Sequence, residues 1–408
     1  MIEYQLYTLP NGIRIAHKQA SNTKIVHCGI MLDIGSRDEL EHQAGLAHFW
    51  EHMAFKGTKK RKSYHIINSL EAVGGELNAY TTKEKICFYA SILDTYFERS
   101  VELLTDITFN SVFPEKQLEI ERGVILEEMA MYLDSPEDAI QDEFDSLVFP
   151  NHQLGVNILG TTESVKSFKR EDFNAFIEEN IDTEKIVFSV VGNFEFKKVI
   201  RIVEKYLKDI PFKKTSKFRI PPVLHDAHNI ELEKANNQAH VAIGSQSFAL
   251  NDSKRLPFFA LVNLLGGPGM NSRFNLSLRE KYGLVYQIEA TYSSFLDTGF
   301  FGIFFGTDPQ NLEKALKLIY REMELLKTKT LGEIQLKTLK EQLKGQLAMS
   351  EESNQGFMLM MAKSLLDLNK IEPILQIFED IDKISKITIQ DLAIEMFDQK
   401  RLSVLIYK

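Results

Sequence analysis

Two histidines and a glutamate lie close together early in the chain, in the order His48-Phe-Trp-Glu51-His52. The pattern of residues 45–56 predicts a helix, on which positions 48 and 52 share a face, so both imidazoles can reach one metal ion. Neutral imidazole suits zinc, and three protein ligands would leave a fourth position for water. Glu51 lies on nearly the same face, where it can take a proton from a metal-activated water that attacks a carbonyl group. The spacing therefore points to zinc-dependent hydrolysis, although it arises by chance in roughly one or two chains per hundred.

A third ligand would distinguish a metal site from a chance pattern, and the predicted helix at residues 114–133 carries several glutamates. Glu121 and Glu128 are two helical turns apart and share a face, whereas Glu127 is turned away by about 100°. That face could present one carboxylate to the metal and the other to a ligand imidazole. Without the histidine motif, a solvated acidic helix would be the better interpretation.

The order His-x-x-Glu-His is the inverzincin pattern, and with its accompanying stretches it resembles the pitrilysin family, in particular the branch similar to mitochondrial processing peptidase. Those stretches are Gly35-Ser-Arg-Asp-Glu39, Gly74-Gly-Glu-Leu-Asn-Ala-Tyr-Thr81, Glu121-Arg-Gly-Val-Ile-Leu-Glu-Glu128 and Leu159-Gly-Thr-Thr-Glu-Ser164. The resemblance implies one zinc ion per chain, with three ligands: His48, His52 and Glu128. It further implies Glu51 as the base and Glu121 as the partner of a ligand imidazole.

The same resemblance assigns a role to Asn78 and Ala79, which lie in a predicted strand after the metal helix. In the family this strand is the edge on which an extended peptide substrate is laid, an example of β-strand addition. Peptides are therefore the expected substrates.

Length and a proline-framed segment indicate two domains. At 408 residues the chain is too long for one ordinary hydrophobic core. Between residues 211 and 222, prolines frame a stretch rich in Lys, Ser and Thr that supports neither a helix nor a central strand. We expect a zinc-binding catalytic domain at residues 1–212, a linker at 213–226 and a second domain at 227–408.

The second half resembles a diverged repeat of the first. A stretch beginning at Glu115 is similar to one beginning at Glu333, and Asp172 corresponds to Asp391, offsets of 218 and 219 residues. The agreement at two distant places predicts an α+β fold with two homologous domains. Each domain is expected to be a mixed or antiparallel β-sheet covered by α-helices.

The second half lacks the zinc residues but carries a different pair of possible functional residues. The segment that corresponds to the His48–His52 helix is Leu265-Gly-Gly-Pro-Gly-Met270, and Gln346 occupies the position that corresponds to Glu128. Arg279 and Tyr286 match the Arg/Tyr pair that the pitrilysin family uses in its C-terminal half. A guanidinium and a phenol can hold a substrate carbonyl and stabilise its oxyanion. We favour this role over an exposed arginine and a packed tyrosine because the first-half motif accompanies them.

The resemblance also predicts the assembly and the reaction. In four-domain relatives the zinc lies on the first domain and the Arg/Tyr pair on the last, so a two-domain chain is expected to pair with a second chain. We expect a homodimer with composite sites, in which Arg279 and Tyr286 of one chain face the zinc residues of the other. The expected activity is that of a zinc metalloendopeptidase cleaving peptides or unfolded polypeptides inside a closed chamber. The alternatives are a non-catalytic structural subunit or one half of a heterodimeric processing peptidase.

Composition restricts the partners and the compartment. A net charge of −9 argues against nucleic acid as a partner. No stretch reaches the roughly 18 uninterrupted apolar residues of a membrane span, and the N-terminus lacks a signal-peptide pattern. Cys28 and Cys87, the only cysteines, lie in apolar stretches that favour buried thiols. We therefore expect a cytoplasmic protein without a membrane partner.

Overall fold

A computed structural model describes residues 4–216, 218–234 and 237–408, and its strands form two sheets. The first sheet contains β1 (Tyr4–Thr8), β2 (Arg14–Gln19), β3 (Ile25–Leu32), β4 (Glu76–Thr81), β5 (Ile86–Leu93) and β6 (Ile186–Gly192). The second sheet contains β7 (Asn229–Leu232), β8 (Ala239–Ser247), β9 (Val285–Ser294), β10 (Gly299–Thr307) and β11 (Ser403–Tyr407).

The order of the strands reveals the duplication. The first sheet runs β1-β2-β6-β3-β5-β4 and the second runs β7-β11-β8-β10-β9. When β1 is set aside, the two orders superimpose, and the parallel pair of each sheet occupies the same place, β2 with β6 and β7 with β11. The remaining pairs are antiparallel. The predicted α+β class, with two homologous domains built on mixed sheets, is confirmed.

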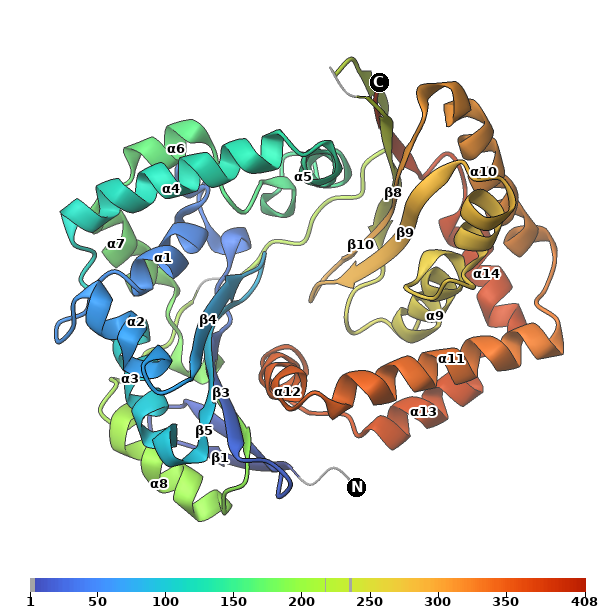
Figure 1. The fold of residues 1–408 in the computed structure, drawn as a ribbon. Helices are drawn as coiled ribbons and strands as arrows, with labels where there is room; N and C mark the ends of the chain where they lie inside the picture. Colours follow the sequence, from blue (N-terminus) through green and yellow to red (C-terminus); the bar gives the residue numbers. More distant parts are fainter. Residues whose placement is uncertain (1–3, 217, 235–236) are drawn as a thin grey trace. The chain divides into compact units, whose positions relative to one another are not determined.

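Helices cover both sheets (Figure 1). In the first half they are α1 (Leu46–Ala54), α2 (Ser63–Glu71), α3 (Phe97–Phe109), α4 (Glu115–Leu133), α5 (Pro136–Val148), α6 (Thr162–Ser167), α7 (Arg170–Asn180) and α8 (Phe196–Leu207). In the second half they are α9 (Arg255–Gly266), α10 (Leu312–Thr328), α11 (Glu333–Glu352), α12 (Asn354–Leu368), α13 (Ile374–Lys383) and α14 (Lys386–Met396), with a π-helix η6 (Asn275–Lys281). None of the described helices is long and apolar enough to cross a membrane.

The chain folds into two compact units that exchange two helical segments. The first unit comprises Met1–Met129, Val156–Arg219 and Ala348–Pro373, and the second comprises Ala130–Gly155, Ile220–Leu347 and Ile374–Lys408. The exchanged segments contain α5, which joins the second unit, and α12, which joins the first. The passage from one unit to the other after Arg219 falls inside the predicted linker. The units nevertheless differ from the expected continuous ranges, because each borrows one helix from the other half.

Apolar packing explains the exchange. Phe357, Met361 and Leu365 of α12 pack with residues of β3 and β6 on one face of the first sheet, and Figure 1 shows α12 beside this sheet. In the second unit, Phe144 and Val148 of α5 lie in a cluster with residues of β8, β10 and β11. Each borrowed helix therefore covers a sheet face that would otherwise expose apolar side chains to water.

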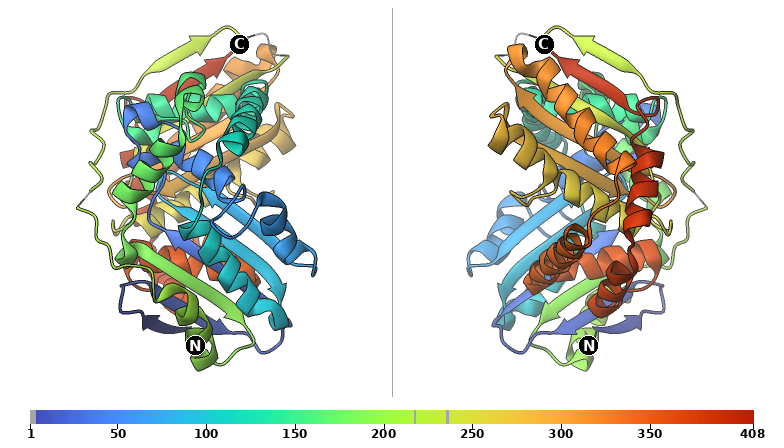
Figure 2. Two further views of the ribbon diagram at one scale, coloured as in Figure 1. Left: turned by 90° about the vertical axis from the view of Figure 1, so that its left-hand side faces the viewer. Right: turned by 90° about the vertical axis from the view of Figure 1, so that its right-hand side faces the viewer.

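The opposite face of the first sheet packs against the first-half helices. Alternate β3 residues, including Cys28 and Ile30, belong to this larger core, whereas Met31 belongs to the α12 side. Cys28 and Cys87 are both free and buried, as predicted. Between α8 and β7, the described part of residues 211–228 contains no helix or strand and runs as an extended segment (Figure 2).

Candidate metal centre

Helix α1 carries the two histidines, and its packing decides which way they face. Phe49, Trp50 and Met53 have no exposed surface and lie in the core of the first unit. The alternation of these apolar residues with His48 and His52 leaves the imidazoles on the opposite face. The helix predicted at residues 45–56 is thus confirmed, and its core-facing stripe orients the motif.

The start of α1 is fixed by a buried carboxylate and a glycine. Glu39 accepts hydrogen bonds from the backbone N–H groups of Gly45 (3.0 Å) and Ala47 (2.7 Å), which satisfies free donors in the first turn. Gly45 adopts a φ of 93°, and a Cβ atom there would lie 2.4 Å from the carbonyl oxygen of Leu159. Glycine is therefore required both for the backbone conformation and for the close approach. Burial raises the pKa of Glu39 to about 8, while the two backbone donors oppose that rise.

A network of buried charges holds the segment before Glu39. The Arg219 guanidinium contacts Asp38 at 2.7 Å and Asp33 at 2.9 Å, and Lys85 contacts Asp33 at 2.8 Å. Burial alone would raise the pKa of Asp33, but the charges and hydrogen bonds of Lys85 and Arg219 outweigh it and lower the pKa to about 2. The middle of the predicted linker is thereby tied to the strand and turn that lead to α1.

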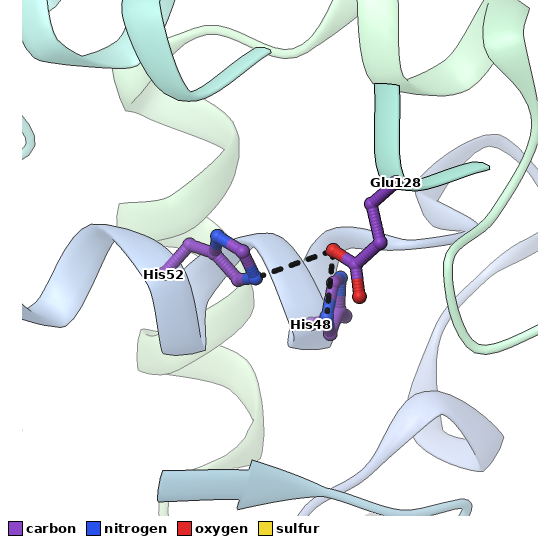
Figure 3. A group of neighbouring side chains, drawn as sticks. All are labelled: His48, His52 and Glu128. Carbon is purple, nitrogen blue, oxygen red and sulfur yellow. Dashed lines mark ion pairs between the residues drawn. The ribbon is translucent and has the colours of Figure 1, made fainter. Parts of the chain in front are cut away.

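Helix α4 brings the third ligand candidate to the histidines (Figure 3). The Glu128 Oε2 atom lies 3.8 Å from His48 Nε2 and 3.6 Å from His52 Nε2. One ligand atom from each of the three residues lies within 4.8 Å of the others, and no other such group of His, Cys, Asp or Glu occurs in the described chain. Ligands placed about 2.0–2.1 Å from a tetrahedral zinc ion would be about 3.3 Å apart, which is close to the two distances from Glu128 to the imidazoles.

The protonation state of His48 suits metal binding. Burial, followed by the neighbouring charge of His52, lowers the pKa of His48 to about 3. The imidazole is therefore neutral near pH 7, as a metal ligand must be. A donor set of two imidazoles and one carboxylate is one that zinc accepts, and it leaves room for a further ligand.

Glu121 contacts the ring nitrogen of His52 that faces away from Glu128, and it also pairs with Lys56. Its Oε2 atom lies 3.3 Å from His52 Nδ1, and its Oε1 atom lies 2.6 Å from the Lys56 ammonium. Burial alone would raise the pKa of Glu121, but the hydrogen bonds of His52 and Lys56 outweigh it and lower the pKa. Of the two carboxylates of α4, Glu128 thus lies next to the Nε2 atoms of both histidines and Glu121 lies next to Nδ1 of His52. Lys56 was not anticipated; it lies just beyond the end of α1, four residues after His52.

Glu51 lies beside this group with one hydrogen-bond donor. The Thr81 hydroxyl donates to Glu51 Oε2 at 2.5 Å. Burial raises the pKa of Glu51, and the Thr81 hydrogen bond and the charge of His52 oppose that rise. Thr81 was not singled out from the sequence, although it ends the Gly74–Thr81 stretch that carries part of the resemblance.

A hollow of about 340 Å³ opens next to Glu51 and His52. Its lining is Glu51, His52, Phe55, Lys56, Ile67, Glu71, Leu77, Asn78, Ala79 and Glu121. Asn78 and Ala79 lie on β4, the edge strand of the first sheet, which pairs with β5 on one side only. Its other side makes no strand pairing with any described residue.

Arg279 and Tyr286 lie in the second unit, on η6 and at the start of β9. The Arg279 guanidinium carbon lies 5.4 Å from the centroid of the Tyr286 ring, and Tyr286 is 83% exposed. The structure thus brings these two side chains together as an exposed pair. The corresponding metal positions of the second half hold Gln346, on α11, and the glycine-rich end of α9.

The duplicated fold and the His-His-Glu group are the features expected of a two-domain peptidase of the inverzincin type. Residues 14–162 match the family model "Insulinase (Peptidase family M16)", and residues 167–343 match the model "Peptidase M16 inactive domain". The uncharacterized zinc protease YmxG of Bacillus subtilis is 32% identical over 98% of this chain and 97% of its own length. An uncharacterized zinc protease of Streptomyces coelicolor is 33% identical over 88% of this chain and 80% of its own. The chain belongs to peptidase family M16, and the resemblance to the pitrilysin-type zinc peptidases is confirmed.

Solved structures share the fold. A protease from Helicobacter pylori superimposes with a TM-score of 0.93 at 21% identity, covering 100% of this chain and 99% of that one. A Pseudomonas fluorescens structure described as a peptidase M16 inactive domain gives a TM-score of 0.90 at 16% identity, covering 99% and 97%. At these identities the likeness concerns the fold alone.

Proposed function

We propose that the protein is a zinc metalloendopeptidase that binds one zinc ion per chain through His48, His52 and Glu128. The observation that carries the proposal is the convergence of these three side chains beside a half-buried glutamate, Glu51. The relatives from Bacillus subtilis and Streptomyces coelicolor are named zinc proteases, which supports zinc as the metal. Peptides or unfolded polypeptides enclosed in a chamber are the proposed substrates.

The side chains divide the work of hydrolysis. Zinc, when bound by the three ligands, supplies a Lewis acid that polarises the water and the substrate carbonyl. Glu51 takes the proton of the attacking water and delivers it to the leaving amine. Glu121 holds the His52 ring through Nδ1, so that Nε2 faces the metal position. Asn78 and Ala79 on β4 bind the peptide backbone as an added strand.

Arg279 and Tyr286 are proposed to hold the substrate carbonyl and to stabilise its developing negative charge. We propose that they do so from a second copy of the chain, in a homodimer with two composite sites of the processing-peptidase type. Their side-by-side, exposed arrangement supports this role, because a residue that acts on a substrate must be open to it. Cytoplasmic localisation also stays a prediction.

A first experiment separates an enzyme from a scaffold. Zinc content of the purified protein is measured together with cleavage of quenched peptide libraries by wild type, Glu51→Gln and the control Glu119→Gln, whose side chain is 69% exposed on α4. We expect about one zinc per chain in all three, and cleavage by wild type and the control only. A chelator should abolish cleavage and added zinc restore it. Zinc binding without any cleavage would favour the non-catalytic subunit, and activity appearing only with a second, different chain would favour a heterodimer.

A second experiment tests the composite site. Glu51→Gln and Arg279→Ala chains, each inactive alone, are mixed under conditions that allow subunits to exchange. Each heterodimer then contains one site with both defects and one site with neither. Up to half of the activity of a wild-type dimer should therefore return in each heterodimer. Absence of rescue in heterodimers verified by differential tagging contradicts the action of Arg279 in trans.

A further inference from the structure

We propose that Thr81 is a positioning residue for the general base, fixing Glu51 from the strand that receives the substrate. The inference rests on the proposed peptidase function and adds a residue to it. The Thr81 hydroxyl donates to Glu51 Oε2 at 2.5 Å, and it is the one hydrogen-bond partner of this carboxylate among the described residues. Hydroxyl-to-carboxylate bonds of 2.5–2.7 Å are among the strong hydrogen bonds of proteins.

The geometry leaves one carboxylate oxygen for chemistry. An ionised carboxylate has two oxygens that accept, and a hydroxyl has a single proton to donate. With Oε2 engaged by Thr81, Oε1 of Glu51 is the oxygen that remains free to take the proton of the attacking water. The bond also limits rotation of the carboxylate about its last side-chain torsion, which is otherwise broad. A base with a fixed free oxygen meets the short proton-transfer distances that catalysis requires.

The position of the hydroxyl is set by the sheet. Thr81 is the last residue of β4 and pairs with Ile86 of β5. The turn that follows is closed by hydrogen bonds between Thr82 and Lys85, from Thr82 N–H to the Lys85 carbonyl oxygen at 2.8 Å and from Lys85 N–H to Thr82 Oγ1 at 2.9 Å. A β-branched side chain has a restricted χ1 angle, so a fixed backbone also fixes its hydroxyl. The base is therefore oriented by a rigid strand end.

This arrangement joins catalysis to substrate binding. Thr81 lies three and two residues after Asn78 and Ala79, the proposed peptide-binding positions on the same strand. A peptide added to the edge of β4 would make this strand less mobile. The Thr81 hydroxyl would then hold the Glu51 carboxylate more firmly. The alternative is that Thr81 serves only to hold β4, in which case its loss would weaken peptide binding instead of the chemical step.

The test compares Thr81→Val, which keeps the shape and removes the hydroxyl, with Thr81→Ser, which keeps the hydroxyl. Thr81→Ala is a second variant without the hydroxyl, and Thr291→Val makes the matched change on β9, the corresponding edge strand of the second sheet. Zinc content and the thermal midpoint are measured first to establish that each variant is folded and metallated. We expect Thr81→Val and Thr81→Ala to lower kcat by about tenfold or more with KM within about twofold, since a positioned base contributes about 10²–10⁴ in rate. Thr81→Ser should retain at least about half of the wild-type kcat, and Thr291→Val should behave as wild type.

A binding measurement independent of activity completes the test. In the Glu51→Gln background peptides are bound without cleavage, and their affinity is measured by fluorescence anisotropy with and without Thr81→Val. Unchanged affinity is expected if Thr81 acts through the base. A weakened affinity, a rise in KM that accounts for the loss, or a kcat of both hydroxyl-free variants within about twofold of wild type overturns the inference. If the wild type binds zinc but cleaves no peptide, both the proposed function and this inference are wrong. If the wild type is active and the Thr81 variants are as active as it is, only the inference is wrong.

Discussion

Replacing Glu121 tests how the proposed metal centre is held, without changing any of its three proposed ligands. Its carboxylate lies 3.3 Å from His52 Nδ1 and 2.6 Å from the Lys56 ammonium, and its side chain is 5% exposed. His48 Nδ1, in contrast, has no hydrogen-bond partner among the described residues. Of the two histidines, only His52 is therefore oriented by a described side chain that contacts its Nδ1 atom.

The expected magnitude follows from these contacts. Loss of a hydrogen-bond partner behind a metal-bound histidine reduces metal affinity by about 10–100-fold, or about 1.4–2.7 kcal/mol. Glu121→Gln keeps an acceptor for His52 but removes the negative charge, so we expect about a tenfold loss of zinc affinity. Glu121→Ala also leaves Lys56 without its countercharge close to the metal position, and we expect a loss of about 100-fold.

The assay is competition for zinc against a chelator of known affinity at neutral pH, with metal-free protein as the starting material. Glu119→Gln, on the same helix but with a 69% exposed side chain, is the control and should bind zinc as wild type does. Circular dichroism of the metal-free proteins establishes that the helices remain. If Glu121→Ala binds zinc within about threefold of wild type, or if Glu119→Gln loses as much affinity, the argument from His52 orientation is refuted.

Three further predictions concern the charges and the turn that hold α1. Arg219→Met should lower the unfolding midpoint measured by calorimetry by about 6–12 °C, because the buried Asp33 and Asp38 both lose the charge of Arg219, at a cost of about 3 kcal/mol. Because the folded-state pKa of Asp33, about 2, lies below its unfolded value, this carboxylate stabilises the fold fully above about pH 4. That contribution, about 2 kcal/mol, is lost as pH falls towards 2, so urea titrations should show the difference between wild type and Asp33→Asn narrowing over this range; a constant difference would contradict the lowered pKa. Gly45→Ala should lower both the thermal midpoint and the zinc affinity, since the left-handed backbone and the adjacent carbonyl leave no room for a Cβ atom; an unaffected variant would refute the steric argument.

Local periodicity was sufficient to find the part of the site that lies on one helix. His48 and His52 follow the i, i+4 rule, and both helices that carry the site were predicted close to their observed bounds. Spacing alone left open which of Glu121 and Glu128 faces the metal, because both lie on one face of α4. The resemblance supplied that choice, and the observed distances agree with it.

Residues that reach the site from other elements were missed. Thr81 meets Glu51 only because the end of β4 passes beside α1, and this proximity depends on how β4 pairs with β5. Glu39 caps α1 from a preceding turn, for which a short sequence pattern gives no unique partner. These contacts are set by tertiary packing, so helical or strand periodicity cannot reveal them.

The exchange of α5 and α12 was likewise beyond the sequence. An amphipathic helix shows the same apolar stripe whichever sheet it covers, and the halves were expected to be continuous because neighbouring elements usually pack together. The clusters of α12 with the first sheet and of α5 with the second decide otherwise.

The borrowed helix α12 has a consequence for biosynthesis. All residues of the metal centre have been made once Glu128 is added, yet the segment Ala348–Pro373 that completes the same unit follows about 220 residues later. At the usual 5–20 residues per second, the ribosome needs about 10–45 s to cover this interval. In the later part of that time, once β6 has been made, the nascent chain presents the apolar face around Met31 and Val187 without its covering helix. The first unit is therefore completed only after residue 373 has left the ribosome, and until then its sheet exposes apolar surface of the kind that favours aggregation.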